Sequence, residues 1–151
     1  MKKIINHKDG FTLVEIMIVV GIMLILAVIA IPAMIRSKVT GNEANAVAAL
    51  RTISTSSNLY LFQNNDFPPA LADLGTGTPP YIDPKLANAS STTTAKDGYY
   101  YAYSLVGQTG FRIIARPSRW RSTGVRSFSV DQNGIILYCE TTATCNPTTS
   151  F

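Results

Sequence analysis

Apolar and polar positions divide this chain into segments of different periodicity. Residues 16–35 carry no charged or hydrogen-bonding side chain, and an apolar run of about twenty residues is long enough for a helix to cross the hydrocarbon core of a bilayer. Beyond this run, apolar side chains recur at helical spacing as far as Tyr60, with polar residues such as Glu43 between them. The pattern predicts one helix from about Phe11 to about Asn64, whose second half is amphipathic.

The helix should end near Asn64, because Pro68 and Pro69 follow and the residue before a proline is disfavoured in a helix. Residues 65–98 are then rich in Gly, Pro, Ser and Thr and predict a surface loop, with one helical turn at 70–74. Period-two alternation predicts four short strands after this loop, at 99–106, 111–116, 125–130 and 135–138. An antiparallel sheet packed on the amphipathic half-helix follows, which is an α+β fold.

Turn chemistry and side-chain alternation indicate how these strands pair. Residues 107–110 and 131–134 favour turns, and the second turn ends in Asn133-Gly134, a strong hairpin dipeptide. Alternate residues of the first strand share a face and can oppose apolar residues of the second strand. These residues are Tyr99, Tyr101, Tyr103 and Leu105, opposed by Phe111, Ile113 and Ala115.

A single carboxylate, Glu15, stands at the start of the apolar run. An unpaired carboxylate near a membrane is costly, so we expect a cationic partner. Residues 1–10 carry three lysines and end in Gly10. A secretory signal peptide is cut after its apolar core, whereas here the small residue precedes the core. Cleavage after Gly10 would give Phe11 a free α-amino group one helical turn from Glu15, which supplies the cation.

Residues 10–20 read Gly-Phe-Thr-Leu-Val-Glu-Ile-Met-Ile-Val-Val and the run closes with Ala-Ile-Pro at 30–32. This stretch resembles the N-terminal signature of type IV pilins and of the pseudopilins of type II secretion. The resemblance implies that a prepilin peptidase removes the leader, that Phe11 is N-methylated, and that subunits assemble through the helix into a homopolymeric filament. It also implies three further partners: an assembly ATPase, an inner-membrane platform protein and an outer-membrane secretin.

The predicted organisation is a leader at 1–10, a transmembrane and assembly helix at 11–35, and an extracytoplasmic domain at 36–151. Within the domain we expect four parts: the amphipathic half-helix at 36–64, a loop at 65–98 like the variable loop of pilins, the sheet at 99–139, and a disulfide loop at 139–145.

Two residues of the apolar run bear on the shape of the helix. Pro32 should bend it or loosen one turn, because proline removes a hydrogen bond and crowds the carbonyl four residues back. The family usually has a glycine where this chain has Leu24, and the nearest glycine is Gly21. The resemblance implies that the helix melts locally between that glycine and the proline. Because Leu24 replaces the glycine, the resemblance does not fix how far this melting extends.

Lysines before the apolar run outnumber the basic residues directly after it, three against two, and favour a cytoplasmic N-terminus. We therefore expect a single-pass precursor in a bacterial inner membrane, followed by an extracellular pilus or a periplasmic pseudopilus. Outside the cytoplasm thiols are oxidised, so Cys139 and Cys145 are expected to form a disulfide. Their spacing lacks the short pairs of a zinc site, and the only histidine, His7, lies in the leader. We expect no enzyme, no metal and no cofactor.

An acid-free basic stretch lies between residues 112 and 126. One interpretation is a surface for an anion such as DNA, a lipid headgroup or polysaccharide. The favoured interpretation is that the arginines flank strand ends and meet acidic groups of adjacent subunits. The candidate residues are Arg112, Arg116, Arg119, Trp120, Arg121 and Arg126.

The leading functional hypothesis is a type IV pilin in which Glu15 of one subunit pairs with the Phe11 amine of a neighbour. The cysteine pair favours this hypothesis because it resembles the disulfide loop of pilins. The alternative is a type II secretion pseudopilin. A third hypothesis is a membrane-anchored basic binding domain that does not polymerise, although such a domain needs neither Gly10 nor Glu15.

Overall fold

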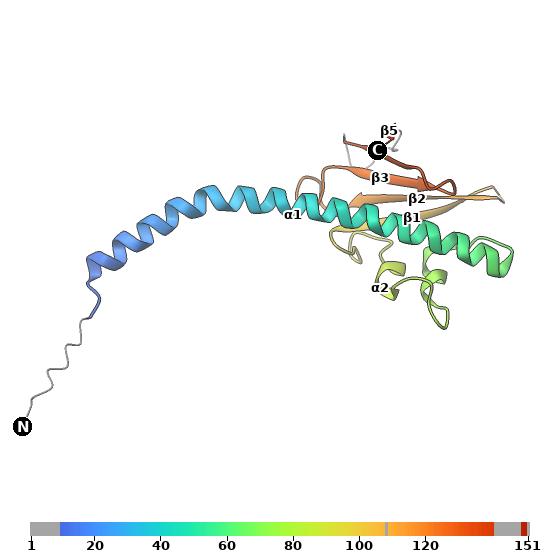
Figure 1. Cartoon of the computed structure of the whole chain (residues 1–151), viewed down its shortest axis with the longest axis horizontal. Helices are drawn as coiled ribbons and strands as arrows, with labels where there is room; N and C mark the ends of the chain where they lie inside the picture. The colour runs from blue at the N-terminus through green and yellow to red at the C-terminus, as the bar shows by residue number, and fades with distance from the viewer. Residues whose placement is uncertain (1–9, 108, 141–148, 151) are drawn as a thin grey trace, which may run out of the picture. The chain divides into compact units, whose positions relative to one another are not determined.

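The structure is a computed structural model that describes residues 10–107, 109–140 and 149–150. The chain divides into two compact units, Met1–Arg36 and Ser37–Phe151. One helix, α1 (Leu13–Asn64), belongs partly to each unit (Figure 1). The helix expected from about Phe11 to about Asn64 is thereby confirmed.

In the first unit, α1 has no apolar core of its own. Every large apolar side chain between Phe11 and Ile35 is exposed, from 42% at Val19 to 79% at Phe11. The helix is long and apolar enough to cross a membrane by length and composition, with a mean hydropathy of 3.0 over its most apolar window. It continues as helix through Pro32, and the bend predicted there stays a prediction.

The second unit contains an antiparallel sheet of five strands in the order β1-β2-β3-β4-β5. The strands are β1 Tyr99–Val106, β2 Gly110–Pro117, β3 Ser127–Asp131, β4 Ile136–Cys139 and β5 Thr149–Ser150. The sequence predicts the first four to within two residues at each end and does not predict β5. The turn before β4 also forms as predicted, with Gly134 at φ 77° and its amide donating to Asp131 O at 3.0 Å.

Side chains of β1 and β2 face one another in the predicted register. Tyr101 lies opposite Ala115, and Tyr103 lies opposite Ile113. These side chains pack with the C-terminal half of α1, which lies along the sheet (Figure 1). The α1 residues in this hydrophobic core are Ala46, Leu50 and Ile53. The fold is therefore the expected α+β arrangement of pilin type.

The segment between α1 and β1 differs from the expected surface loop, because it supplies part of the core. Its buried apolar residues are Phe67, Leu71, Leu74, Ile82, Leu86, Ala87 and Ala89. The predicted turn at 70–74 is a short 3₁₀ helix, η1 (Leu71–Gly75). A second short helix, α2 (Pro84–Ala87), is not predicted, although Asp83 before Pro84 carries the signal of a helix start.

Candidate functional site

Thr12 and Glu15 together shape the start of α1. The Glu15 amide donates to Thr12 Oγ1 at 3.2 Å, and the spacing Thr-x-x-Glu is that of a capping box. This role of Thr12 was not predicted from the sequence, although the spacing indicates it. The cap places Glu15 in the first helical turn, where the partial positive charge of the helix end favours a carboxylate.

The Glu15 carboxylate is exposed and makes no hydrogen bond or ion pair with any residue that the structure describes. Phe11 lies before the helix and is exposed, as is Gly10. Residues 1–9 of the predicted leader lie outside the described residues. As far as the described residues go, the Glu15 carboxylate is therefore available for a partner of opposite charge.

The apolar side chains that follow Glu15 are exposed on all sides of the helix. A helix that is apolar on all sides is not stable in contact with water. It is stable only when lipid or other protein covers it. The arrangement can therefore insert into a membrane, pack with other apolar helices, or do each in turn.

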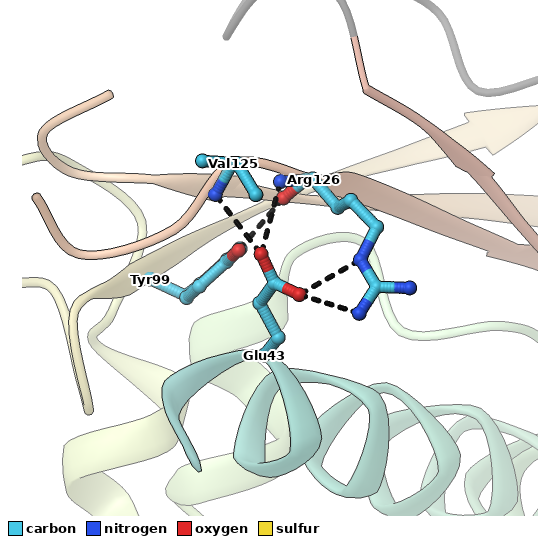
Figure 2. Close-up of polar contacts among 4 residues, drawn as sticks. All are labelled: Glu43, Tyr99, Val125 and Arg126. Carbon is cyan, nitrogen blue, oxygen red and sulfur yellow. Dashed lines mark hydrogen bonds and ion pairs between the residues drawn. The ribbon is translucent and has the colours of Figure 1, made fainter. Parts of the chain in front are cut away.

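A second polar site, the Glu43 cluster, joins α1 to the segment before β3 and consists of Glu43, Tyr99, Val125 and Arg126 (Figure 2). Glu43 is buried, with only 4% of the residue exposed. Its Oε1 accepts from the amides of Val125 at 2.9 Å and Arg126 at 3.2 Å. Its Oε2 accepts from Arg126 Nε at 2.7 Å and lies 2.7 Å from a second guanidinium nitrogen. Both guanidinium nitrogens thus bind the same carboxylate oxygen, and hydrogen bonds between two charged groups are stronger than those between neutral ones.

Neighbouring contacts hold the same segment in place. The Tyr99 hydroxyl donates to Arg126 O at 2.7 Å, and burial raises the pKa of Tyr99 above its ordinary value. A Cβ at Gly124 would collide with the Tyr99 hydroxyl, so glycine is required there. One residue before Glu43, the Asn42 side-chain amide donates to Thr123 O at 2.9 Å. Consecutive residues of α1 thus fix the segment from Thr123 to Arg126.

The Glu43 cluster explains why β3 begins at Ser127 and not at the predicted residue 125. The amides of Val125 and Arg126 bind the Glu43 carboxylate and are therefore not used for pairing with another strand. Glu43 was predicted to lie among the polar residues between the apolar positions of the helix. Its spacing of three before Ala46 and seven before Leu50 in fact places it within the apolar stripe.

The six candidate residues of the predicted basic stretch lie in three different environments. Arg126 is neutralised within its own chain by Glu43, and its guanidinium lies 5.9 Å from the ring centroids of both Phe128 and Tyr138. Arg112 and Arg116 alternate along β2 with buried residues and so belong to the sheet face turned away from the core. The other three, Arg119, Trp120 and Arg121, lie in the segment between β2 and β3. The favoured interpretation, contact with acidic groups of adjacent subunits, stays a prediction.

The predicted disulfide would join two cysteines near the C-terminus. Cys139 ends β4, whereas Cys145 lies outside the described residues, so the bridge stays a prediction. Among the residues that the structure describes, no three His, Cys, Asp or Glu side chains form a group that could hold a metal ion.

Comparison with known proteins gives matches at both ends of the chain. Residues 5–31 match the family model described as Prokaryotic N-terminal methylation motif. Residues 85–144 match a model described as Protein of unknown function (DUF2950). The Competence protein ComGC of Halalkalibacterium halodurans is 34% identical over 68 residues, which cover 45% of this chain and 67% of that protein. The Type II secretion system core protein G of Aeromonas hydrophila is 31% identical over 63 residues, which cover 42% of this chain and 44% of that protein.

Proposed function

Because this chain belongs to the type IV pilin and pseudopilin family, we propose that it is the structural subunit of a filament that assembles outside the cytoplasm through the N-terminal helix. The family consists of structural proteins and not of enzymes. One observation carries the proposal: the apolar helix beyond Glu15 is exposed on every side, and the Glu15 carboxylate has no partner among the described residues. Both features suit a segment that lies in a membrane before assembly and among copies of itself afterwards.

The first step of the proposed assembly is removal of the leader. A prepilin peptidase cuts between Gly10 and Phe11, and the new N-terminus at Phe11 is methylated. The match of residues 5–31 to the methylation motif supports this step. It leaves a mature chain that begins directly before the cap residue Thr12.

The second step is charge pairing between subunits. The amine of Phe11 in an incoming subunit meets the Glu15 carboxylate of a neighbour in the growing filament. An ion in a low-dielectric environment costs several kcal/mol when it is unpaired, so an arrangement that leaves Glu15 and Phe11 unpaired is strongly disfavoured. The pairing therefore fixes the axial step between subunits as well as their attraction.

The substitution Glu15→Leu tests this mechanism. It makes the apolar helix more apolar and removes the partner of the Phe11 amine. We expect precursor levels near normal by immunoblot of the membrane fraction, and no filaments by electron microscopy of sheared material. Glu140→Leu is the matched control, because it also removes an exposed carboxylate but lies outside the helix. Normal filament numbers from Glu15→Leu alone would contradict the pairing, whereas filament loss in both variants would point to a general effect of charge.

The favoured filament is a type IV pilus, and the alternative is the pseudopilus of a type II secretion system. The predicted disulfide loop supports the first, and the match to Type II secretion system core protein G supports the second. In either case the proposed partners are further copies of the chain, an assembly ATPase, a platform protein and a secretin. Filaments recovered from the cell surface at native expression indicate a pilus, and filaments confined to the periplasm indicate a pseudopilus.

A further inference from the structure

A hollow of about 700 Å³ opens in the second unit where three segments meet. The segments are the part of α1 near Lys38, the residues before β1, and the loop between β2 and β3. Its lining holds two cations, Lys38 and Arg119, together with five serine and threonine hydroxyls and no acidic residue. This composition suits an anion that carries several oxygen atoms.

The two cations of the hollow are not used by the fold. The side chains of Lys38 and Arg119 form no hydrogen bond or ion pair with any described residue. By contrast, Lys96 lies 2.6 Å from Asp83, and Arg126 is paired with Glu43. The hollow therefore keeps a positive charge after the internal pairs have formed. The hydroxyls of Thr92 and Ser122 likewise have no partner among the described residues and remain available as donors.

The wall of the hollow that carries Arg119 is held in place before any ligand binds. The Ser118 amide donates to Gly98 O at 2.8 Å, and the Thr123 hydroxyl lies 3.1 Å from both the amide nitrogen and the carbonyl oxygen of Arg119. Gly98 has φ 79°, and a Cβ there would lie 2.8 Å from the Thr123 Cβ. Glycine thus permits the close approach of the two segments. A wall fixed in this way loses little conformational entropy when it binds a ligand.

The position of Lys38 along the chain indicates which kind of anion the hollow would bind. Lys38 is three residues beyond Ile35, where the apolar run ends, a rise of about 4.5 Å along a helix. Lipid phosphates lie at that level when residues 16–35 cross the membrane. We propose that the hollow binds the phosphate and headgroup of an anionic glycerophospholipid and so holds the domain against the membrane surface before assembly. This inference rests on the membrane anchoring in the proposed function.

Two features favour an anionic lipid over a zwitterionic one. The hollow offers no carboxylate to the ammonium group of a phosphatidylcholine headgroup. It offers several hydroxyls that can bond to the phosphate oxygens and to the glycerol hydroxyls of phosphatidylglycerol. Phosphatidylglycerol is therefore the probe of choice.

The test uses the full chain in an uncharged detergent, titrated separately with short-chain phosphatidylglycerol, short-chain phosphatidylcholine and inorganic phosphate. Trp120 is the only tryptophan and directly follows Arg119, so its fluorescence reports on the loop. We expect a saturable change with phosphatidylglycerol and none with the other two ligands over the same concentrations. An equal response to phosphatidylcholine would overturn the headgroup preference, and an equal response to phosphate would show a general anion site.

Charge-matched variants assign the binding to the hollow. Lys38→Gln with Arg119→Gln should weaken the phosphatidylglycerol response by about tenfold or more, given the usual contribution of two cations near a lipid surface. Arg51→Gln with Arg112→Gln removes two exposed cations elsewhere and should leave the affinity nearly unchanged. Equal losses in the two double variants would overturn the site. Flotation of the wild-type chain with phosphatidylcholine vesicles tests anchoring separately, so a chain that floats but shows no phosphatidylglycerol preference contradicts this site alone.

Discussion

Both carboxylate oxygens of Glu43 have hydrogen-bond partners within the fold. One oxygen accepts two backbone amides, and the other binds the Arg126 guanidinium. Loss of one partner of a buried pair costs far more than loss of an exposed pair, because the remaining groups are left without water or a partner. The Glu43 cluster therefore secures the attachment of α1 to the segment before β3.

Glu43→Ala should destabilise the second unit by about 2 to 3 kcal/mol, below the full cost of a broken buried pair because the Arg126 guanidinium keeps some access to water. Urea unfolding of the full chain in detergent, followed by Trp120 fluorescence, measures the change. Glu140→Ala serves as the control, since that carboxylate is exposed. If the two variants unfolded at the same urea concentration, the Glu43 cluster would make no contribution to the stability of the fold.

Alkaline pH should weaken the fold through its buried tyrosines. Burial raises the pKa of Tyr103 to about 12 and raises that of Tyr99 as well, with a smaller contribution from the charge of Glu43 at Tyr99. In the unfolded chain the pKa of tyrosine is about 10. The unfolded state therefore loses protons first, and the free energy of unfolding falls as pH rises from about 10 toward the folded-state values.

The check is urea unfolding at a series of alkaline pH values, with tyrosinate absorbance recorded in parallel. The loss of stability should begin near pH 10, and Tyr103→Phe should make it less steep. A free energy of unfolding that stays constant through this range would contradict the effect of tyrosine burial.

Among the elements, those with local signals were predictable and those with distant partners were not. Pro68 and Pro69 indicate the end of α1 at Asn64, and Asn133-Gly134 indicates the turn before β4. The start of β3 is wrong in the prediction because the amides of residues 125 and 126 bind Glu43, more than eighty positions earlier in the chain.

The burial of apolar side chains in the segment between α1 and β1 was also not predictable from the sequence. Its apolar residues are spaced irregularly between prolines, glycines and hydroxyl residues, so neither helical nor strand periodicity marks them. Leu74 is fully buried, and its carbonyl accepts the amides of Tyr81 and Ile82 at 2.9 and 3.2 Å. Contacts of this kind depend on the packed domain and cannot be inferred from composition. One exception is Asp83-Pro84, whose residue types are typical of a helix start and could have predicted α2.

Two glycines allow a matched test of how the elements join. Gly124→Ala should destabilise the second unit, because the new Cβ displaces the Tyr99 hydroxyl from Arg126 O. Gly41→Ala should be neutral or stabilise by about 0.5 to 1 kcal/mol, since alanine is the better helix former and nothing lies within 4 Å of the new Cβ. Thermal unfolding of the two variants measures both changes. Equal effects would contradict the close approach at Gly124.

At the scale of the whole molecule, the two units have opposite surface properties. The first exposes its apolar side chains, and the second buries its own around α1, the sheet and the segment between them. Under the proposed function, the first unit is stable only in lipid or among neighbouring helices, whereas the second can fold before assembly. Substitutions at Glu15 should therefore affect assembly, and substitutions in the Glu43 cluster should affect folding.

The proposed function requires that the chain polymerises through its N-terminal helix after cleavage at Gly10. The most direct measurement is the N-terminal residue of subunits in purified sheared filaments, determined by mass spectrometry of the N-terminal peptide. We expect filaments whose subunits begin at N-methylated Phe11. Subunits that begin at Met1 within intact filaments, or a processed chain that never forms filaments, would contradict it.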